Sequence, residues 1–150
     1  MDNRYEFLGY PDNFENNPIS DIVLDVVRHG PVIDAGCGNG NLLMLLKNNF
    51  DVEGFDISKV AVGLARKRGL NVKEAGIENF KTKKKFKTIL MIGLLMLTKD
   101  PKRYLDLASK WLNKGGVIML TIPNAISLKN FFGLAKRRTK CSNPHTDSRA

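Results

Sequence analysis

The sequence predicts an α/β fold in which a mostly parallel sheet carries helices on both faces. Short apolar segments alternate with amphipathic segments from residue 20 to residue 122. The apolar segments are hydrophobic at consecutive positions, so neither of their faces suits water, which is typical of parallel strands. Glycines and capping residues separate the two kinds of segment. Strands that alternate with helices form parallel sheets through right-handed crossovers.

The first predicted elements are a helix, a strand, a second helix and a second strand. The first helix begins at Ser20, whose side chain can cap it, and ends at Gly30. A short apolar strand covers 31–35, and a helix over 39–49 turns four leucines inward. The second strand covers 51–56. A glycine-rich loop therefore lies between the first strand and its helix.

The middle of the chain continues the alternation. Ser58 is expected to cap a helix that ends at Gly69. A weak third strand covers 71–75, and a lysine-rich stretch separates it from a fourth strand over 88–92. The fourth strand is apolar on both faces, which places it inside the sheet.

The last predicted elements begin with a strong helix start. Asp100 can cap a helix, and Pro101 suits its first position. Gly115 and Gly116 are expected to end this helix, and the fifth strand covers 117–122. A further helix is predicted over 127–136.

The length of 150 residues suits one domain with a sizeable core. We expect an N-terminal arm over 1–19, a ligand-binding domain over 20–135, and a basic polar tail over 136–150 or the start of a truncated C-terminal part. The longest apolar run is too short to cross a bilayer. Cys37 and Cys141 have no metal-type spacing. These features favour a reduced, cytoplasmic location without a metal site.

The chain is basic, with 24 Lys and Arg against 15 Asp and Glu and a net charge of +9. The excess is concentrated in KTKKKFK at 81–87 and KRRTK at 136–140. Such patches can attract nucleic acid or an anionic membrane surface. A solvated loop and a solvated tail are the favoured interpretation, because no aromatic residues are interleaved to stack on bases.

The glycine-rich loop in VIDAGCGNGNLL carries the main functional signal. Gly36, Gly38 and Gly40 permit backbone angles closed to other residues, and they let a ligand approach bare backbone. The loop follows a strand of a parallel sheet, where such folds bind ligands. The following helix start offers N–H groups, which would suit a flat or anionic group. Cys37 is interpreted as a small residue tolerated in the turn rather than a reactive thiol.

Two acidic residues indicate which ligand the loop suits. A dinucleotide loop would have glycine or alanine at position 41, where this chain has Asn41. Asp34 directly before the turn would repel a pyrophosphate but attract an ammonium group. Asp56 ends the second strand, and its carboxylate can accept hydrogen bonds from both hydroxyls of a ribose. An NAD-dependent reductase is therefore the least favoured alternative.

Three segments together resemble the Rossmann-like S-adenosylmethionine-dependent methyltransferases, of the methyltransferase type 11/12-like kind. They are VIDAGCGNG, GFDIS at 54–58 and LNKGGVIMLTIPN at 112–124. The resemblance covers roughly residues 20–130. It implies a three-layer sandwich whose mostly parallel sheet has seven strands, of which about five are evident here and the sixth and seventh are not. The domain predicted over 20–135 would then bind S-adenosyl-L-methionine and release S-adenosyl-L-homocysteine.

The resemblance also implies roles for individual residues. Asp34 would hold the amino group of the methionyl part, and the Ala35 to Gly38 turn, with Gly36 and Cys37, would cradle the methionyl and ribose parts through its backbone. Further residues would surround the adenine and the sulfonium. They are Asp56 for the ribose hydroxyls, Ile57 for the adenine face, Ile77 or Glu78 for the adenine amine, and Met91 and Ile92 near the sulfonium.

The implied reaction transfers a methyl group to an oxygen or nitrogen of a small molecule. The segment after the fourth strand lacks the Asn/Asp-Pro-Pro-aromatic motif of enzymes that methylate exocyclic amines of nucleobases, and Pro123-Asn124 fits small-molecule relatives best. No catalytic base is assigned. RNA or protein methylation through the basic patches stays open as an alternative. A non-catalytic cofactor-binding module with a regulatory or interaction role is the third interpretation.

The fifth strand, VIMLTI, raises a question of partners. Without further strands it would present an apolar edge, which is an association hazard. We therefore expect either that the chain is a fragment of a longer one or that a dimer contact or another partner covers this edge.

Overall fold

The computed structural model describes residues 17–122. The helix predicted over 127–136, the basic tail and most of the N-terminal arm lie outside the described residues. The predicted domain boundaries therefore stay predictions.

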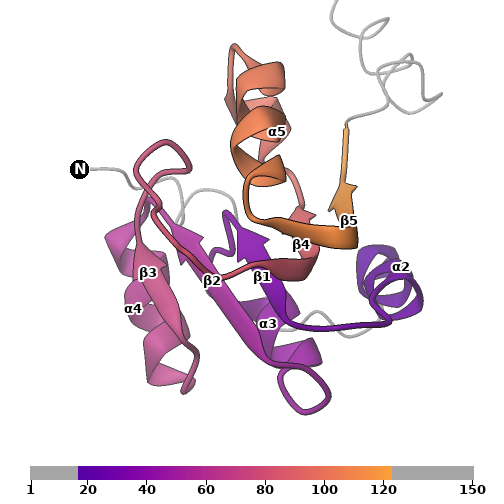
Figure 1. Ribbon diagram of the computed structural model, residues 1–150. Coiled ribbons are helices and arrows are strands. Elements are labelled where there is room, and N and C mark those ends of the chain that lie inside the picture. Colours follow the sequence, from indigo (N-terminus) through magenta and orange to yellow (C-terminus); the bar gives the residue numbers. More distant parts are fainter. Residues whose placement is uncertain (1–16, 123–150) are drawn as a thin grey trace, which may run out of the picture.

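The five predicted strands form one sheet with the order β3-β2-β1-β4-β5 (Figure 1). Their bounds are Val32–Ala35 for β1, Val52–Asp56 for β2, Val72–Glu74 for β3, Phe86–Met91 for β4 and Leu112–Leu120 for β5. Every neighbouring pair is parallel. The strand order reverses between β1 and β4, and open parallel sheets bind ligands beside this switch point, at the carboxyl ends of the strands. The predicted α/β class is confirmed.

The helices form two layers around the sheet. They are α2 (Pro18–Val26), α3 (Asn41–Leu46), α4 (Lys59–Lys67) and α5 (Pro101–Ser109), with a short 3-10 helix η1 (Leu95–Leu97) after β4. One apolar cluster joins Val23 of α2 and Leu46 of α3 to Val32 and Leu90 of the sheet. The other face packs against α5, and Figure 1 shows this helix apart from the other three.

Alternation along the strands explains the two layers. Val32 and Ile33 are both fully buried but belong to different clusters, because successive side chains of a strand point to opposite faces. On the α5 face the Phe55 and Phe80 rings stack with centroids 4.2 Å apart, and Trp111 packs edge-on against both. This aromatic group anchors the end of β2, from which Asp56 projects.

Two of the predicted helix starts are confirmed. The Ser58 hydroxyl accepts a hydrogen bond of 3.3 Å from the Ala61 amide at the start of α4. Asp100 Oδ1 accepts one of 3.0 Å from the Arg103 amide at the start of α5. The first helix differs, since Asn17 caps it and accepts from the Ile19 amide. Pro18 takes the first helical position, so the helix begins before the predicted cap Ser20, which is buried inside it.

Other predicted boundaries also differ, and α2 ends at Val26 rather than at Gly30. The helix after the glycine loop ends at Leu46 rather than 49, because the Leu46 carbonyl accepts from the Asn49 and Phe50 amides in a tight turn. The α5 helix ends at Ser109, well before Gly115, and β5 begins at Leu112. The intervening residues bulge out, since Leu112 pairs with Phe86 while the next pair is Val117 with Thr88.

Candidate functional site

The two predicted acidic site residues lie on neighbouring strands, Asp34 in β1 and Asp56 at the end of β2. Asp34 of β1 pairs with Gly54 of β2, and Ala35 pairs with Phe55, so the carboxyl end of β1 lies beside that of β2. Asp34 and Asp56 are close enough for the charge of Asp56 to raise the pKa of Asp34. The pairing therefore brings the two acids together, as the sequence predicts.

The glycine loop adopts the backbone that its composition requires. Gly36, Gly38 and Gly40 have φ of 79°, 56° and 81°, in the left-handed region that disfavours side chains. The Gly36 and Cys37 amides both donate to the Phe55 carbonyl, at 2.9 and 3.0 Å. The loop thus folds back onto the end of β2.

The loop uses its N–H groups internally. Besides the two bonds to Phe55, the Gly38 amide donates to Asp56 and the Gly40 amide to the Cys37 carbonyl, each at 2.9 Å. The amides of these four residues are therefore already bonded within the protein, and they are not free to bind an anion. This arrangement favours a ligand that presents donors to the carboxylates over one that presents a pyrophosphate.

Asp56 is buried and held in place. Its Oδ2 accepts from the Gly38 amide at 2.9 Å and its Oδ1 from the Ser58 amide at 2.8 Å. A carboxylate has about four lone-pair positions, so each oxygen keeps capacity for one more donor. Asp56 can therefore organise the loop and still accept hydrogen bonds from a diol.

Asp34 is the most unusual residue of the site. Its side chain is 3% exposed, and the neighbouring Asp56 brings a second negative charge close to it. Burial, with a smaller contribution from Asp56, raises the pKa of Asp34 to about 7. A buried carboxyl group beside a second acid is costly to ionise unless something compensates its charge, and a cation arriving at the loop would do so.

Cys37 is inert in this environment. Burial raises the pKa of its thiol, and the neighbouring Asp34 and Asp56 raise it further. A thiol that stays protonated is a poor nucleophile. This agrees with the interpretation of Cys37 as a small packing residue.

The remaining predicted residues divide into exposed and buried sets. Ile57 is 74% exposed directly after β2, and Glu78 is exposed with an ion pair of 3.5 Å to Arg103. Four others have buried or partly buried side chains. Among these, Ala35 and Ile77 can contact a ligand mainly through their backbone. These four are Ala35, Ile77 and Met91 in the cluster on the α5 face, and Ile92 against the opposite cluster.

Sequence reasoning missed three residues that shape the loop. Gly54 leaves room for Cys37, because a Cβ at Gly54 would lie 3.0 Å from the Cys37 sulfur. Leu94 lies over Gly36, where a Cβ would come within 3.1 Å of its Cδ1. Arg68, at the end of α4, donates to the Asn39 carbonyl at 3.0 Å and to Asn41 Oδ1 at 2.6 Å. Only the glycine in DVEGFD could have been noticed in advance, as an interruption of an apolar strand.

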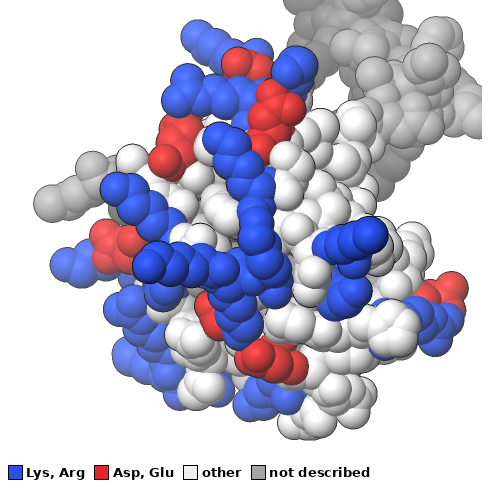
Figure 2. All heavy atoms as spheres, in the orientation of Figure 1, with Lys and Arg blue, Asp and Glu red and all other residues white. Residues whose placement is uncertain are grey.

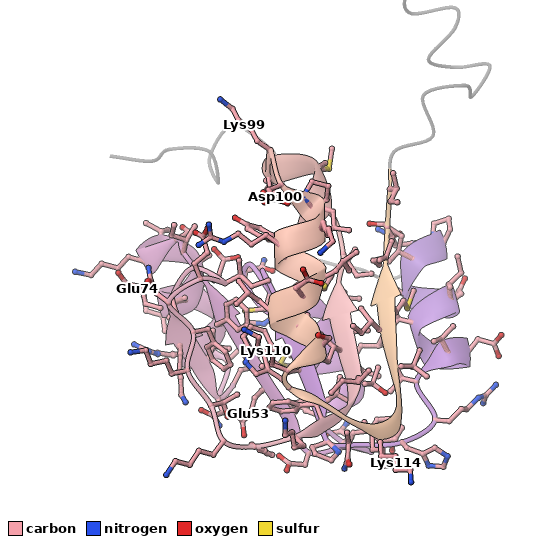
Figure 3. All side chains as sticks on the ribbon, turned by 45° about the horizontal axis from the view of Figure 1, so that its top comes forward. Glu53, Glu74, Lys99, Asp100, Lys110 and Lys114 are labelled. Atoms are coloured by element: carbon pink, nitrogen blue, oxygen red, sulfur yellow. The ribbon has the colours of Figure 1, made fainter. Side chains whose placement is uncertain are left out.

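The lysine-rich segment 81–87 lies at the amino ends of the strands, opposite to the end that carries the glycine loop. Lys84 pairs with Asp51 and Glu53 at the start of β2, at 2.8 and 2.6 Å. The ammonium groups of two further lysines donate to backbone carbonyls, Lys85 to Lys110 and Lys87 to Lys114. Figure 2 shows lysine and arginine side chains gathered on one face of the molecule. In Figure 3, Glu53 and Lys114 lie at the lower end of the sheet, whereas Lys99 and Asp100 lie at the upper end.

Residues 17–122 contain no group of three or more His, Cys, Asp or Glu side chains placed to hold a metal ion. No helix in the same range is long and apolar enough to cross a membrane.

Comparison with known proteins identifies the family. A family model described as a methyltransferase domain matches residues 13–146. No curated protein matches the chain. Among solved structures, a S-adenosylmethionine-dependent methyltransferase of Thermotoga maritima, described as a possible histamine N-methyltransferase, is 26% identical with a TM-score of 0.68, over 80% of this chain and 57% of that chain.

Two other solved structures contain S-adenosylhomocysteine. The plantazolicin methyltransferase BpumL is 26% identical with a TM-score of 0.58, over 67% of this chain and 42% of its own. Coclaurine N-methyltransferase, bound to N-methylheliamine, is 25% identical with a TM-score of 0.61, over 68% of this chain and 34% of its own. The chain thus spans less than two thirds of each of these relatives.

These comparisons confirm the predicted family, the Rossmann-like fold and S-adenosylmethionine as the cofactor of the family. The family model covers most of the sequence, and the sheet order places the glycine loop beside the switch point. The chain therefore belongs to the methyltransferase-domain family of S-adenosylmethionine-dependent enzymes.

Proposed function

We propose that the chain binds S-adenosylmethionine at the carboxyl ends of β1 and β2 and transfers its methyl group to an oxygen or nitrogen of a small molecule. The observation that carries this proposal is the buried Asp34 carboxylate, which lies beside a glycine turn and close to a second acid, Asp56. A ligand ammonium would compensate the charge of Asp34 and favour its ionised form.

The residues present fit the cofactor. Asp34 would hold the methionyl amino group, and the backbone of Gly36, Cys37 and Gly38 would border the methionyl and ribose parts. Asp56 would accept from the ribose hydroxyls through the lone pairs that Gly38 and Ser58 leave free. The exposed Ile57 would cover one face of the adenine, with Ile77 or Glu78 near its amine and Met91 and Ile92 near the sulfonium.

The chemistry divides between cofactor and protein. The bound cofactor supplies an electrophilic methyl group on a sulfonium sulfur, and in-line displacement passes that methyl to a lone pair of the acceptor. The chain's own residues bind and orient, and positioning of this kind contributes about 7–11 kcal/mol in favourable cases. The buried ends of β1 and β4 would keep water away from the reacting atoms.

Several observations support a small acceptor over nucleic acid. The lysine-rich segment 81–87 lies at the amino ends of the strands, away from the glycine loop, and three of its lysines are bonded to the chain itself. The three solved relatives are described as a possible histamine N-methyltransferase, a plantazolicin methyltransferase and a coclaurine N-methyltransferase. We also propose a cytoplasmic location, from cysteine usage, and the domain bounds 20–135. A partner on the β5 edge stays a prediction.

Calorimetric titration tests the proposal. Wild type should bind S-adenosylmethionine and S-adenosylhomocysteine but not NAD, and Asp56→Ala should weaken binding at least tenfold because charged hydrogen bonds contribute about 1.5–3 kcal/mol each. Asp106→Ala is the matched control, since Asp106 is an exposed acid bonded to Lys102 on α5. Binding of NAD alone, or equal loss in both variants, would contradict the proposal.

A further inference from the structure

The most exposed large apolar side chains gather at the carboxyl end of the sheet. Ile57 after β2 is 74% exposed, Met96 and Leu97 in η1 are 61% and 69% exposed, and Ile122 after β5 is 72% exposed. We call these four residues the apolar rim. Single exposed apolar residues are ordinary, but a group at one end of a sheet marks a binding surface.

Contacts join the rim to the glycine loop. Leu94, which begins the η1 turn, lies over Gly36. The Gly93 amide donates to Thr121 Oγ1 at 2.8 Å, so the end of β5, and with it Ile122, is tied to the loop after β4. The rim residues therefore stand on loops that adjoin the proposed cofactor site, and Ile57 belongs to both.

The η1 turn presents its apolar side chains outward for a local reason. The Leu97 amide donates to the Leu94 carbonyl at 3.1 Å, which closes the turn. Leu95 is buried in the cluster on the α5 face and anchors the turn, so that its neighbours Met96 and Leu97 are left exposed. The segment 92–98 carries no charged side chain. An uncharged turn that exposes apolar side chains is suited to packing against an apolar molecule.

We propose that the methyl acceptor has a large apolar body, aromatic or branched aliphatic, which packs on Met96, Leu97 and Ile122 while its acceptor atom reaches the site beside Gly36. This inference rests on the proposed function and adds the substrate class to it. Burial of apolar surface supplies the binding free energy, so a polar acceptor of the same reactive group binds more weakly.

Two matched amines test the acceptor class. Binding of 2-(naphthyl)ethylamine and of ethanolamine is measured by ligand-observed NMR with S-adenosylhomocysteine present. The naphthyl compound should bind at least tenfold more tightly. Leu97→Gln and Met96→Gln should each weaken it about tenfold, the ratio expected from roughly 60 Å² of apolar surface. The control Ile22→Gln changes an exposed apolar residue of α2 and should have no effect.

The outcomes separate this inference from the proposed function. Failure of wild type to bind S-adenosylhomocysteine overturns the proposed function itself. With S-adenosylhomocysteine bound, equal affinity for the two amines, binding of neither, or equal losses in the control overturns the apolar acceptor alone. Sedimentation and vesicle-binding assays test whether the apolar rim instead binds a second copy of the chain or a membrane. A dimer that Leu97→Gln dissociates, or binding to phosphatidylcholine vesicles that it abolishes, would also overturn the inference.

Discussion

Arg68 provides a sharp test of how the glycine loop is held. Its guanidinium reaches from the end of α4 and donates to the Asn39 carbonyl and to Asn41 Oδ1, at 3.0 and 2.6 Å. Replacing Arg68 by Met keeps much of the aliphatic stem and removes both bonds. We expect the loop, rather than the whole fold, to lose its fixed geometry.

The structure sets the size of the effect. Hydrogen bonds from a charged group contribute about 1.5–3 kcal/mol when buried, and less here because Arg68 is half-buried and water can replace it. A loss of about 1 kcal/mol of stability follows. If the loop must be ordered again on binding, the same free energy raises the Kd of S-adenosylhomocysteine about fivefold.

The neighbouring Arg66 supplies the matched control. It lies on the same helix, and its Nε donates to the Val72 carbonyl at 2.9 Å, so it holds β3 and not the loop. Urea unfolding and calorimetry should show similar stability losses for the two Met variants but weaker binding only for Arg68→Met. Arg68→Lys should recover part of the affinity. Equal binding losses in both variants, or a destabilised Arg68→Met with unchanged affinity, would refute this reasoning.

Three other predictions concern stability. Because the folded pKa of Asp34 is raised from 3.8 to about 7, the folded state holds the extra proton between these values, and stability should fall as pH rises through about 4 to 7. The fall is at most about 4 kcal/mol, and Asp34→Asn should remove it in urea titrations at several pH values. Gly54→Ala should cost about 1–3 kcal/mol, because the added Cβ would lie 2.7 Å from a Leu43 methyl, whereas Gly63→Ala, with open space on α4, should stabilise by about 1 kcal/mol. If Gly63→Ala destabilised the protein, the explanation of both glycine substitutions by the space around the added Cβ would be wrong. Asp100→Ala should lower the free energy of unfolding by about 1 kcal/mol through loss of the α5 cap, and an unchanged thermal midpoint would exclude that role.

The sequence by itself determined the class of fold, the glycine turn and the two acids. These features are encoded within a few neighbouring residues. Asp34 and Asp56 each stand at the end of an apolar segment, and parallel pairing brings such ends to one edge of a sheet. The start of α5 is equally local, since Asp100 and Pro101 specify a cap and a first helical position.

Only the tertiary structure decided how the site is supported and where the charges lie. Arg68 bonds to Asn39 and Asn41, which lie 29 and 27 positions earlier in the chain. Leu94, after β4, lies over Gly36, after the neighbouring strand β1. The sequence favoured a solvated loop for the lysines of 81–87 and left docking open, and only the fold showed that three of them bond to carboxylates and carbonyls at the amino ends of the strands. Periodicity and capping depend on neighbours within one or two turns, whereas these contacts depend on the packing of distant segments, which no local pattern records.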